Sequence, residues 1–375
     1  MRVLHLLESG GLYGAERVVL NLSSAMRDGG AFEPVIGCIV QDDGEPSALF
    51  DEARRQGFAA EKVRLRNLGL AVDAPRAARR WRDLDIRLVH SHGYKATVFG
   101  SCVRALRPVP MTATCHLWFI GPHSPLKMRA MVAAELRLYR RFRTVAAVSA
   151  EIRRVLLRSG VAPERVQVIP NGIPVDRPAP GAAERAAMRA ALGVPEGAFI
   201  VLNAGRLTAQ KDQASLLRAV GGAPEGGRGL HCVVAGEGEL HAVLQREIDD
   251  NGWSPRVSLL GFRDDVPALL GAVDAFALPS LDEGMPMILL EAAAAGLPLV
   301  ATPVGDIPTL LADGRNGLLV PPGDVAALRA ALLRLRDEPG LAERLGRAAR
   351  AEVCREHSSE SMYARYAEVY RAHVG

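Results

Sequence analysis

The stretch LPSLDEGMPMILLEAAAAGLPLVAT, residues 278–302, decides the fold because it joins two apolar strands through one helix. The runs AFALPS, which ends at Ser280, and LPLVAT predict buried strands. Pro286 suits the first position of a helix because its missing N–H is not needed there, and Gly296 is a typical helix stop. A strand, a helix and a strand in this order predict a parallel sheet covered by helices.

The same alternation runs through the rest of the chain. The first half contains the apolar runs VLHLL, PVIGCIV, IRLVHSH, MTATCH and TVAAVS. The second half contains FIVLNAGR, HCVVAGEGE, VSLLGF, AFALPS and LPLVAT, after a proline- and glycine-rich segment at 168–181 that reads as a linker. This predicts an α/β protein with two Rossmann-like domains, residues 1–172 and 173–357, and a last helix at 358–375 that could pack back on the first domain.

Composition narrows the class of protein. The chain has 375 residues and five scattered cysteines without a CxxC pair, which argues against a disulfide framework or a zinc site. No cleavable signal is expected at the start, and no apolar run reaches the ~18 residues of a membrane span. These features predict a cytoplasmic protein, either soluble or peripheral on the inner face of the membrane.

Charge is unevenly distributed along the chain. Residues 1–175 hold 26 Lys and Arg against 16 Asp and Glu, whereas the remainder holds 20 against 26. An anionic partner therefore suits the first half better, and nucleic acid is not expected. The segment KMRAMVAAELRLYRRFR, residues 127–143, predicts an amphipathic helix. That helix either simply covers the sheet or also presents its basic face to an anionic membrane surface.

Ligands collect at the carboxyl ends of parallel strands, and the residues there are informative. Arg206 and Lys211 follow the strand FIVLNA, and two cations in a loop suit a diphosphate, although they could equally be solvated charges. The first turn of the helix after Pro286 suits an anion. Glu283 and Glu291, near that turn, are better placed to accept hydrogen bonds from the hydroxyl groups of sugars and riboses.

Two other patterns are ambiguous. SGGLYGAERVVLNL resembles a dinucleotide-binding turn, but Ser9 stands where the fingerprint needs its first glycine. His90 and His92 alternate on a predicted strand and could suggest a metal site. No Asp, Glu or His completes a ligand set in the sequence, so neither a metal nor another cofactor is expected.

Taken in order, these motifs resemble the family-4 retaining glycosyltransferases of the GT-B type, whose two Rossmann-like domains face each other across a cleft. The resemblance covers nearly the whole chain. It rests on GLYGAERVV, VHSH, TCH, AVS, VIPNGI, AGRL with Lys211, AGEGE, GFRDDV, the two glutamates separated by seven residues in EGMPMILLE, and GLLVPPGD.

The resemblance implies roles for individual residues. Arg206 and Lys211 would neutralise the leaving diphosphate, Glu291 would hold the ribose and Glu283 the transferred sugar. His116 would be the active-site histidine beside that sugar. Further donor contacts are expected at Gly11, Gly14, Gly236, Phe262, Arg263, Gly284, Met285 and Met287.

The implied reaction moves a sugar from a nucleotide-diphosphate sugar to an acceptor hydroxyl, with retention and without a metal ion. The acceptor would be a saccharide or a lipid-linked saccharide in cell-surface polysaccharide or glycolipid synthesis. Three alternatives remain open: a sugar-nucleotide epimerase of the same double-Rossmann architecture, a dehydrogenase, and a non-catalytic relative that only binds nucleotide sugar.

Overall fold

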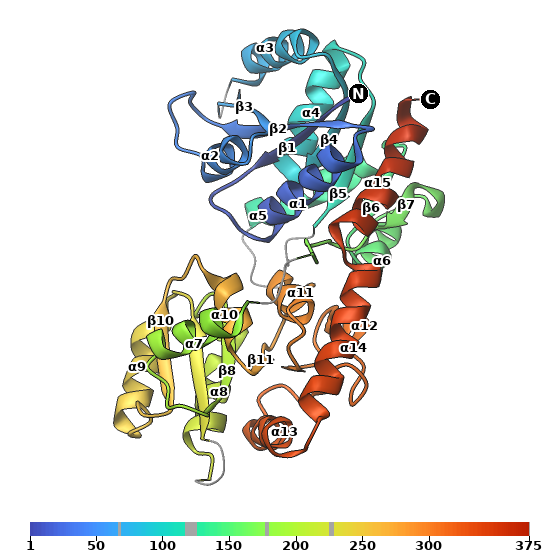
Figure 1. The fold of residues 1–375 in the computed structure, drawn as a ribbon. Coiled ribbons are helices and arrows are strands. Elements are labelled where there is room, and N and C mark those ends of the chain that lie inside the picture. The colour runs from blue at the N-terminus through green and yellow to red at the C-terminus, as the bar shows by residue number, and fades with distance from the viewer. Residues whose placement is uncertain (67–68, 117–125, 177–179, 225–228, 375) are drawn as a thin grey trace. The chain divides into compact units, whose positions relative to one another are not determined.

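The computed structural model describes residues 1–66, 69–116, 126–176, 180–224 and 229–374, and the chain divides into two units. Unit 1 comprises Met1–Gly172 together with Ser359–Gly375, and unit 2 comprises Ile173–Ser358. Each unit has its own parallel sheet, as the ribbon in Figure 1 shows. Each unit also has its own hydrophobic core.

Unit 1 is built on a sheet with the strand order β3-β2-β1-β4-β5-β6-β7. The strands are β1 (Arg2–Glu8), β2 (Glu33–Val40), β3 (Ala59–Arg64), β4 (Ile86–His92), β5 (Met111–Cys115), β6 (Val145–Ala147) and β7 (Val166–Val168). The helices between them are α1 (Gly14–Gly29), α2 (Ala48–Arg55), α3 (Leu70–Asp83), α4 (Tyr94–Leu106), α5 (Leu126–Tyr139) and α6 (Ala150–Arg158), with a short 3-10 turn η1 (Pro163–Arg165).

The last helix, α15 (Ser359–Val374), belongs to unit 1 although it follows unit 2 in sequence. It packs on α1 and β4. The four side chains that the sequence places on one of its faces are all buried, namely Met362, Tyr366, Val369 and Tyr370. The end of the chain thereby supplies part of the covering of the first sheet.

Unit 2 has the strand order β10-β9-β8-β11-β12-β13. Its strands are β8 (Phe199–Ala204), β9 (Leu230–Ala235), β10 (Val257–Gly261), β11 (Ala275–Leu278), β12 (Leu299–Ala301) and β13 (Leu318–Leu319). Its helices are α7 (Ala182–Ala191), the 3-10 turn η2 (Ala209–Lys211), α8 (Gln213–Gly221), α9 (His241–Asp250), α10 (Val266–Ala272), α11 (Met287–Ala294), α12 (Ile307–Leu310), α13 (Val325–Asp337) and α14 (Leu341–Glu356).

Both sheets reverse their strand order at one central pair. In unit 1 the reversal lies between β1 and β4, and in unit 2 it lies between β8 and β11. The loops that leave these two strands diverge to opposite faces of the sheet, so a crevice forms at their carboxyl ends. Parallel α/β sheets bind their ligands at such positions, and this directs attention to the residues that follow these four strands.

The predicted α/β class with two Rossmann-like domains is confirmed. One local prediction is wrong: Pro286 is not the first helical residue. It is the N-cap with an extended backbone (ψ 117°), and α11 begins at Met287. Its carbonyl accepts a hydrogen bond from the N–H of Leu289, so the proline flanks the helix although its own backbone is not helical. Gly296 follows the helix with a left-handed φ of 78°, as a terminating glycine does.

Two general expectations can be compared with the described parts of the chain. Cys38, Cys102, Cys115, Cys232 and Cys354 are all free thiols. Among the described residues, no helix is long and apolar enough to cross a membrane.

Candidate functional site

Four histidines gather at the switch point of unit 1. His5 lies on β1 directly opposite His90 of β4, and His92 lies two residues further along β4. His5 Nδ1 is 3.2 Å from His92 Nε2, and His92 Nδ1 is 3.1 Å from His116 Nε2, just beyond β5. The ring predicted to be the active-site histidine is therefore the outermost of a row of three hydrogen-bonded imidazoles.

His90 is held by a separate set of hydroxyl groups. Its Nδ1 lies 2.8 Å from the Tyr370 hydroxyl, and its Nε2 lies 2.7 Å from the Thr114 hydroxyl. The Tyr366 hydroxyl completes the network 2.7 Å from that of Thr114. Both tyrosines come from α15, so this helix satisfies the innermost polar groups of the cluster as well as covering the sheet.

Burial keeps these imidazoles neutral. It lowers the pKa of His5 to about 3 and that of His116 to about 4. The pKa values of His90 and His92 lie well below the usual value, first because of burial and then because the neighbouring imidazoles would repel a second charge. At neutral pH these four imidazoles therefore offer hydrogen-bonding groups without charge.

The structure adds a third imidazole to the pair that the sequence considers as a metal site. Ligand atoms of His5, His90 and His92 all lie within 4.8 Å of one another. Both nitrogens of His90 already face the hydroxyls of Tyr370 and Thr114, so ligation by His90 would break one of these bonds. The expectation that the site holds no metal remains a prediction.

The glycine-rich turn after β1 leads directly into α1. Tyr13 is the N-cap, and its N–H donates to the side chain of Glu16, as in a capping box. Gly14 is the first residue of the helix, which places its amide in the first turn, where N–H groups have no partner within the helix. A Cβ on Gly11 would lie 2.9 Å from the ring of Tyr13, so this loop is closely folded on itself. The predicted approach of Gly11 and Gly14 to a diphosphate is compatible with this geometry.

The centre of the unit 2 site is an ion pair. Lys211 Nζ lies 2.5 Å from Glu283 Oε1, which also accepts a 2.7 Å hydrogen bond from the Ser280 hydroxyl. Glu283 is only 8% exposed. Lys211 follows β8 and Glu283 follows β11, so the pair spans the switch point of the second sheet. A cation and an anion held side by side can serve two different parts of one ligand.

Arg206 stands at the same edge, exposed to solvent. Its carbonyl accepts a 2.9 Å hydrogen bond from the Gln213 side chain, which fixes the loop between β8 and α8. A Cβ on Gly236 would come 1.9 Å from the carbonyl oxygen of Gly205, whose N–H in turn bonds to the end of β9. Gly236 is therefore required for the close crossing of these two loops, in addition to its predicted role at the donor.

A second close crossing supports Glu283. Gly305 has a left-handed φ of 55°, and a Cβ there would come 1.9 Å from the Glu283 carbonyl oxygen. The N–H of Asp306 donates to the carbonyl of Gly284 at 3.2 Å. The loop after β12 thus fixes the backbone in front of α11, where Met285 and Met287 pack on the core. Glu291 follows one turn later within α11, as predicted.

Two of the predicted donor contacts, Phe262 and Arg263, lie after β10. Gly261 has a left-handed φ of 68°, and its carbonyl accepts a 2.7 Å hydrogen bond from the N–H of Gly236. Phe262 is 72% exposed. The guanidinium of Arg263 pairs in a bidentate manner with Asp265, at 2.7 and 2.5 Å. This pairing orients Arg263 along its own loop.

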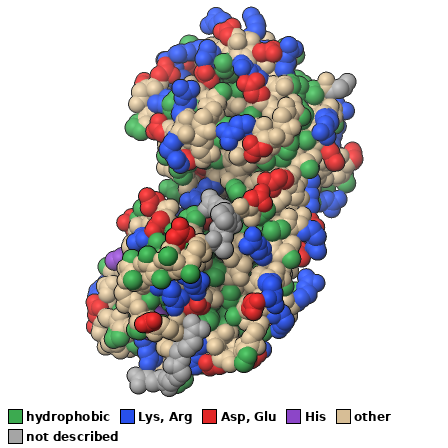
Figure 2. Space-filling view, in the orientation of Figure 1, with side chains coloured by type: hydrophobic (Ala, Val, Ile, Leu, Met, Phe, Trp, Pro, Cys, Tyr) green, Lys and Arg blue, Asp and Glu red, His purple; other side chains and the backbone are tan. Residues whose placement is uncertain are grey.

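The amphipathic segment 127–143 uses its apolar side chains in the core of unit 1. Val132, Tyr139 and Phe142 are buried, with at most 6% exposure. The basic side chains of the segment are exposed, namely Arg129, Arg137, Arg140, Arg141 and Arg143. Lys and Arg are interspersed with Asp and Glu over the face shown in Figure 2. Three apolar side chains of the segment are thus used in the core, while its described arginines form an exposed basic face.

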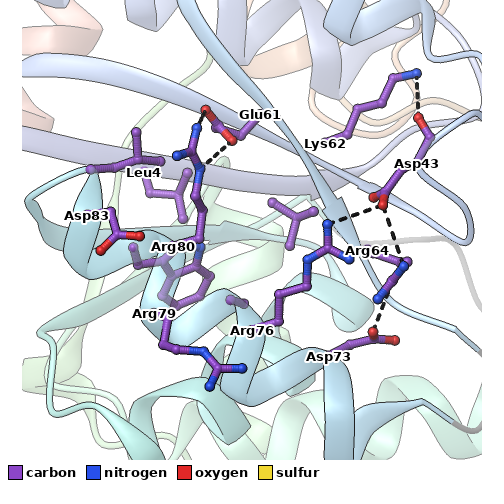
Figure 3. A pocket seen from close by; sticks show the side chains of 14 residues that line it. Leu4, Asp43, Glu61, Lys62, Arg64, Asp73, Arg76, Arg79, Arg80 and Asp83 are labelled. Atoms are coloured by element: carbon purple, nitrogen blue, oxygen red, sulfur yellow. Dashed lines mark hydrogen bonds and ion pairs between the residues drawn. The ribbon is translucent and has the colours of Figure 1, made fainter.

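A cavity of about 350 Å³ lies at the β3 edge of the unit 1 sheet, away from the switch point of that sheet (Figure 3). Three of its arginines pair with carboxylates of the same cavity: Arg64 and Arg76 with Asp43, and Arg80 with Glu61. Because these cations already have anionic partners, the cavity is a less suitable anion site than the loops after β8 and β11.

Comparisons with known proteins agree with this reading of the two units. The model of Glycosyltransferase Family 4 matches residues 13–177, and the model of Glycosyl transferases group 1 matches residues 184–352. The chain is a GT-B glycosyltransferase. Nothing in these comparisons favours the epimerase alternative.

Individual relatives have low sequence identity to this chain, but their similarity extends over most of its length. The UDP-Gal:alpha-D-GlcNAc-diphosphoundecaprenol alpha-1,3-galactosyltransferase of Escherichia coli is 27% identical, over 81% of this chain and 80% of that one. The 2-deoxystreptamine glucosyltransferase of Streptomyces kanamyceticus is 28% identical over 70% of both. Among solved structures, Anabaena HepE in complex with UDP shares the fold with a TM-score of 0.86 at 23% identity, covering 99% of this chain and 100% of that one.

Several residues of the two clusters escape sequence reasoning. His5 gives no signal by itself, because a single histidine in an apolar strand is usual in a core. Its partners become visible only when the register of β1 and β4 is known. Ser280 lies in a predicted strand end and Gly305 in a loop, and both acquire meaning only through their contacts with Glu283. Ser280 could have been found by its position, because it is a polar residue just after a strand that borders the switch point.

Proposed function

We propose that this glycosyltransferase moves a sugar from a nucleotide-diphosphate sugar to an acceptor hydroxyl, with retention at the anomeric carbon and without a metal ion. The bond between the anomeric carbon and the diphosphate oxygen breaks, and a bond to the acceptor oxygen forms on the same face. The acceptor proton passes to the departing diphosphate oxygen. The acceptor is a saccharide or a lipid-linked saccharide, in line with the diphosphoundecaprenol-linked acceptor in the name of the Escherichia coli relative.

The observation that carries this proposal is the Lys211–Glu283 pair at the unit 2 switch point. Negative charge grows on the diphosphate as the sugar departs, and a fixed lysine with Arg206 nearby in sequence stabilises charge at that stage. Glu283 accepts hydrogen bonds from sugar hydroxyls. These cations perform the task that a divalent ion performs elsewhere, which is why we propose metal independence.

The test is a panel of nucleotide sugars incubated with the protein and a polar lipid extract, followed by NMR of the products. We expect a new glycoside with the anomeric configuration of the donor, together with free nucleoside diphosphate. An isomerised sugar without a glycoside would instead identify an epimerase, and an inverted linkage would refute retention. Arg206→Ala, prepared in the same way, controls for contaminating transferases because it should lose the product.

We also propose that an anionic membrane surface is a partner, through the basic face of segment 127–143. The support is the exposed arginines of this segment and the position of two of them in a basic pocket. That pocket is lined by Arg104, Arg141, Arg143, Thr144, Glu164 and Arg165. Because the apolar side chains are used in the core, the attraction would be electrostatic and therefore sensitive to salt.

Co-sedimentation with vesicles tests this partner. The double variant Arg141→Gln/Arg143→Gln should weaken binding to phosphatidylglycerol vesicles by roughly 30-fold, at about 1 kcal/mol for each charge. Arg315→Gln/Arg347→Gln, two exposed positions of unit 2, is the matched control and should bind as the wild type does. Equal binding to neutral vesicles, or binding to neither, would remove this partner and leave the transferase proposal standing.

A further inference from the structure

The row of imidazoles in unit 1 ends on a sulfur atom. His5 Nε2 lies 3.2 Å from Sδ of Met26 on α1, and both residues are fully buried. From there the contacts run through His5 Nδ1 to His92 Nε2, and from His92 Nδ1 to His116 Nε2. One ring from the middle of β1 and two from the ends of β4 and β5 are thus joined to one thioether in a single line.

The thioether sulfur determines which nitrogen of each imidazole in this row carries the proton. A thioether can accept a hydrogen bond but has no proton to donate, so the proton of this contact must be on His5 Nε2. A neutral imidazole carries only one N–H, which leaves His5 Nδ1 as an acceptor. The proton between the next two rings is therefore on His92 Nε2. By the same reasoning His92 Nδ1 accepts, and the proton of the last contact is on His116 Nε2.

The premise of neutral rings has independent support. Two adjacent charged imidazoles at these distances would repel each other in a site with little water to screen them. The surrounding side chains on α15, Tyr366 and Tyr370, offer hydroxyl groups and no carboxylate that would stabilise a charge. Burial lowers the pKa of all four histidines, as described above.

We propose that Met26, His5 and His92 are positioning residues that fix His116 as the Nε2–H tautomer and leave its Nδ1 as a hydrogen-bond acceptor. The function of this atom rests on the proposed transferase activity: a substrate hydroxyl must donate to it. The unit 1 site would then select hydroxyl groups by their proton, and a group that can only accept would be rejected.

Two arrangements compete with this one. In the reversed line His116 carries its proton on Nδ1, and His5 Nε2 directs a lone pair at the sulfur lone pairs, which gives no attraction. In the other arrangement a divalent ion sits among His5, His90 and His92. Ligating nitrogens carry no proton, so with an ion there the donors and acceptors between the rings would no longer be fixed by the sulfur.

The tautomers can be read directly by NMR of the full chain labelled with 15N-histidine. Each histidine variant removes one set of ring signals, which assigns the nine histidines. We expect Nε2–H tautomers for His5, His92 and His116 at pH 7. A protonated Nδ1 on His116, a mixture of its two tautomers, or a stoichiometric divalent ion found by metal analysis would overturn the proposal.

Met26→Leu tests the origin of the direction, because leucine has nearly the same volume but no acceptor. His116 should become a mixture of tautomers, and kcat/KM should fall roughly two- to tenfold. Met111→Leu changes another buried methionine of unit 1 that has no contact with the line, so it is the matched control and should keep the wild-type tautomers. Unchanged tautomers in Met26→Leu would show that the sulfur does not set the direction.

His92 separates the positioning role from packing. His92→Asn can keep an acceptor near the Nδ1 position, whereas His92→Phe cannot, so the asparagine variant should retain the Nε2–H tautomer of His116 and the phenylalanine variant should lose it. Equal tautomer populations in the two variants would contradict the proposal. Because the NMR measurement of the His116 tautomer needs no substrate, its outcome does not depend on the transferase activity. A missing glycoside product would refute the proposed reaction and leave the tautomers unaffected.

Discussion

The two switch points have the same topology and opposite chemistry. In unit 1 the strands β1 and β4, the end of β5 and helix α15 bring together neutral imidazoles and hydroxyl groups, and an ion pair between Glu8 and Lys95 lies at the same edge of the sheet. In unit 2 the loops after β8 and β11 bring together a lysine and a glutamate, with an exposed arginine at the same edge. Two sheets of similar construction therefore differ at the switch point: unit 1 has a buried cluster of neutral rings, and unit 2 has a largely buried lysine–glutamate pair.

The difference matches the two kinds of group in the proposed reaction. A diphosphate that gains charge is stabilised by fixed cations, whereas a hydroxyl group is recognised by a neutral donor or acceptor. The sugar and the acceptor present hydroxyl groups, so the imidazoles of unit 1 can bind them without being charged. The comparison predicts that substitutions in unit 2 act mainly on the departing diphosphate, and substitutions in unit 1 mainly on the protonation of the site.

The largest effect is expected from the cations of unit 2. Arg206→Ala and Lys211→Ala should each lower kcat by roughly 10²-fold or more, because both would act on charge that develops in the transition state. Their stabilities should differ. Arg206 is exposed, but Lys211→Ala leaves the buried carboxylate of Glu283 without its cation, at a cost of about 3 kcal/mol.

Steady-state kinetics and denaturant unfolding measure both parts of this prediction. Arg246→Ala, an exposed arginine on α9 of the same unit, is the control and should be indistinguishable from the wild type. Wild-type kinetics in Arg206→Ala and Lys211→Ala together would refute the assignment of the diphosphate to these residues.

Acid should destabilise the protein through the histidines of unit 1. Unfolded His5 takes up a proton near pH 6.5, but in the folded protein burial lowers its pKa to about 3. Between these values the unfolded state binds more protons, so the free energy of unfolding falls as the pH falls. His5 alone contributes about 1.4 kcal/mol per pH unit, or about 2 kcal/mol between pH 6.5 and 5.

Denaturant unfolding at several pH values checks this slope. His5→Asn should flatten it by about one proton, whereas His241→Asn, exposed in unit 2, should leave the slope nearly unchanged. If His5→Asn kept the wild-type slope, the buried histidine would not be the titrating group.

Glu283→Gln separates sugar binding from diphosphate binding within unit 2. The amide keeps the shape and one acceptor, but it loses the charge that pairs with Lys211. We expect kcat to fall about tenfold while the Kd for UDP changes less than about threefold, because the lysine remains available to the diphosphate. Titration calorimetry and kinetics give the two numbers, and a parallel loss of both would contradict separate roles for the pair.

The smallest expected effect is that of a chelator. With Lys211 and Arg206 as the cations of the site, EDTA should leave the rate of transfer unchanged within error. Loss of activity in EDTA with recovery in Mg²⁺ or Mn²⁺ would mean that these side chains do not replace an ion.

The extent of prediction from sequence follows the same division. Apolar strands such as β1 and β8 could be predicted because buried parallel strands are nearly uniform in composition. The glutamates around Pro286 could be predicted because they lie close to a strand end in sequence. The edge strand β3 escaped because its sequence AAEKVR is mostly half-exposed, and β7 and β13 are only three and two residues long. Edge strands have one open side and lack the continuous apolar run on which the prediction relies.

The candidate site divides in a comparable way. Cations and carboxylates of unit 2 were visible because each lies close to a strand end in sequence. The line from Met26 to His116 was not visible, because it depends on the register of β1 against β4 and on the direction in which α1 presents a methionine. Such contacts join residues 21 to 87 positions apart and leave no local pattern.

The central claim is that the cations at the unit 2 switch point bind the diphosphate and the histidines of unit 1 do not. Titration calorimetry with UDP, the nucleotide bound in the similar Anabaena structure, tests it most directly in the wild type, Arg206→Ala and His116→Ala. The account predicts that Arg206→Ala weakens UDP binding by about tenfold or more, whereas His116→Ala binds UDP as the wild type does and loses only turnover. Equal weakening in both variants, or weakening in His116→Ala alone, would contradict it.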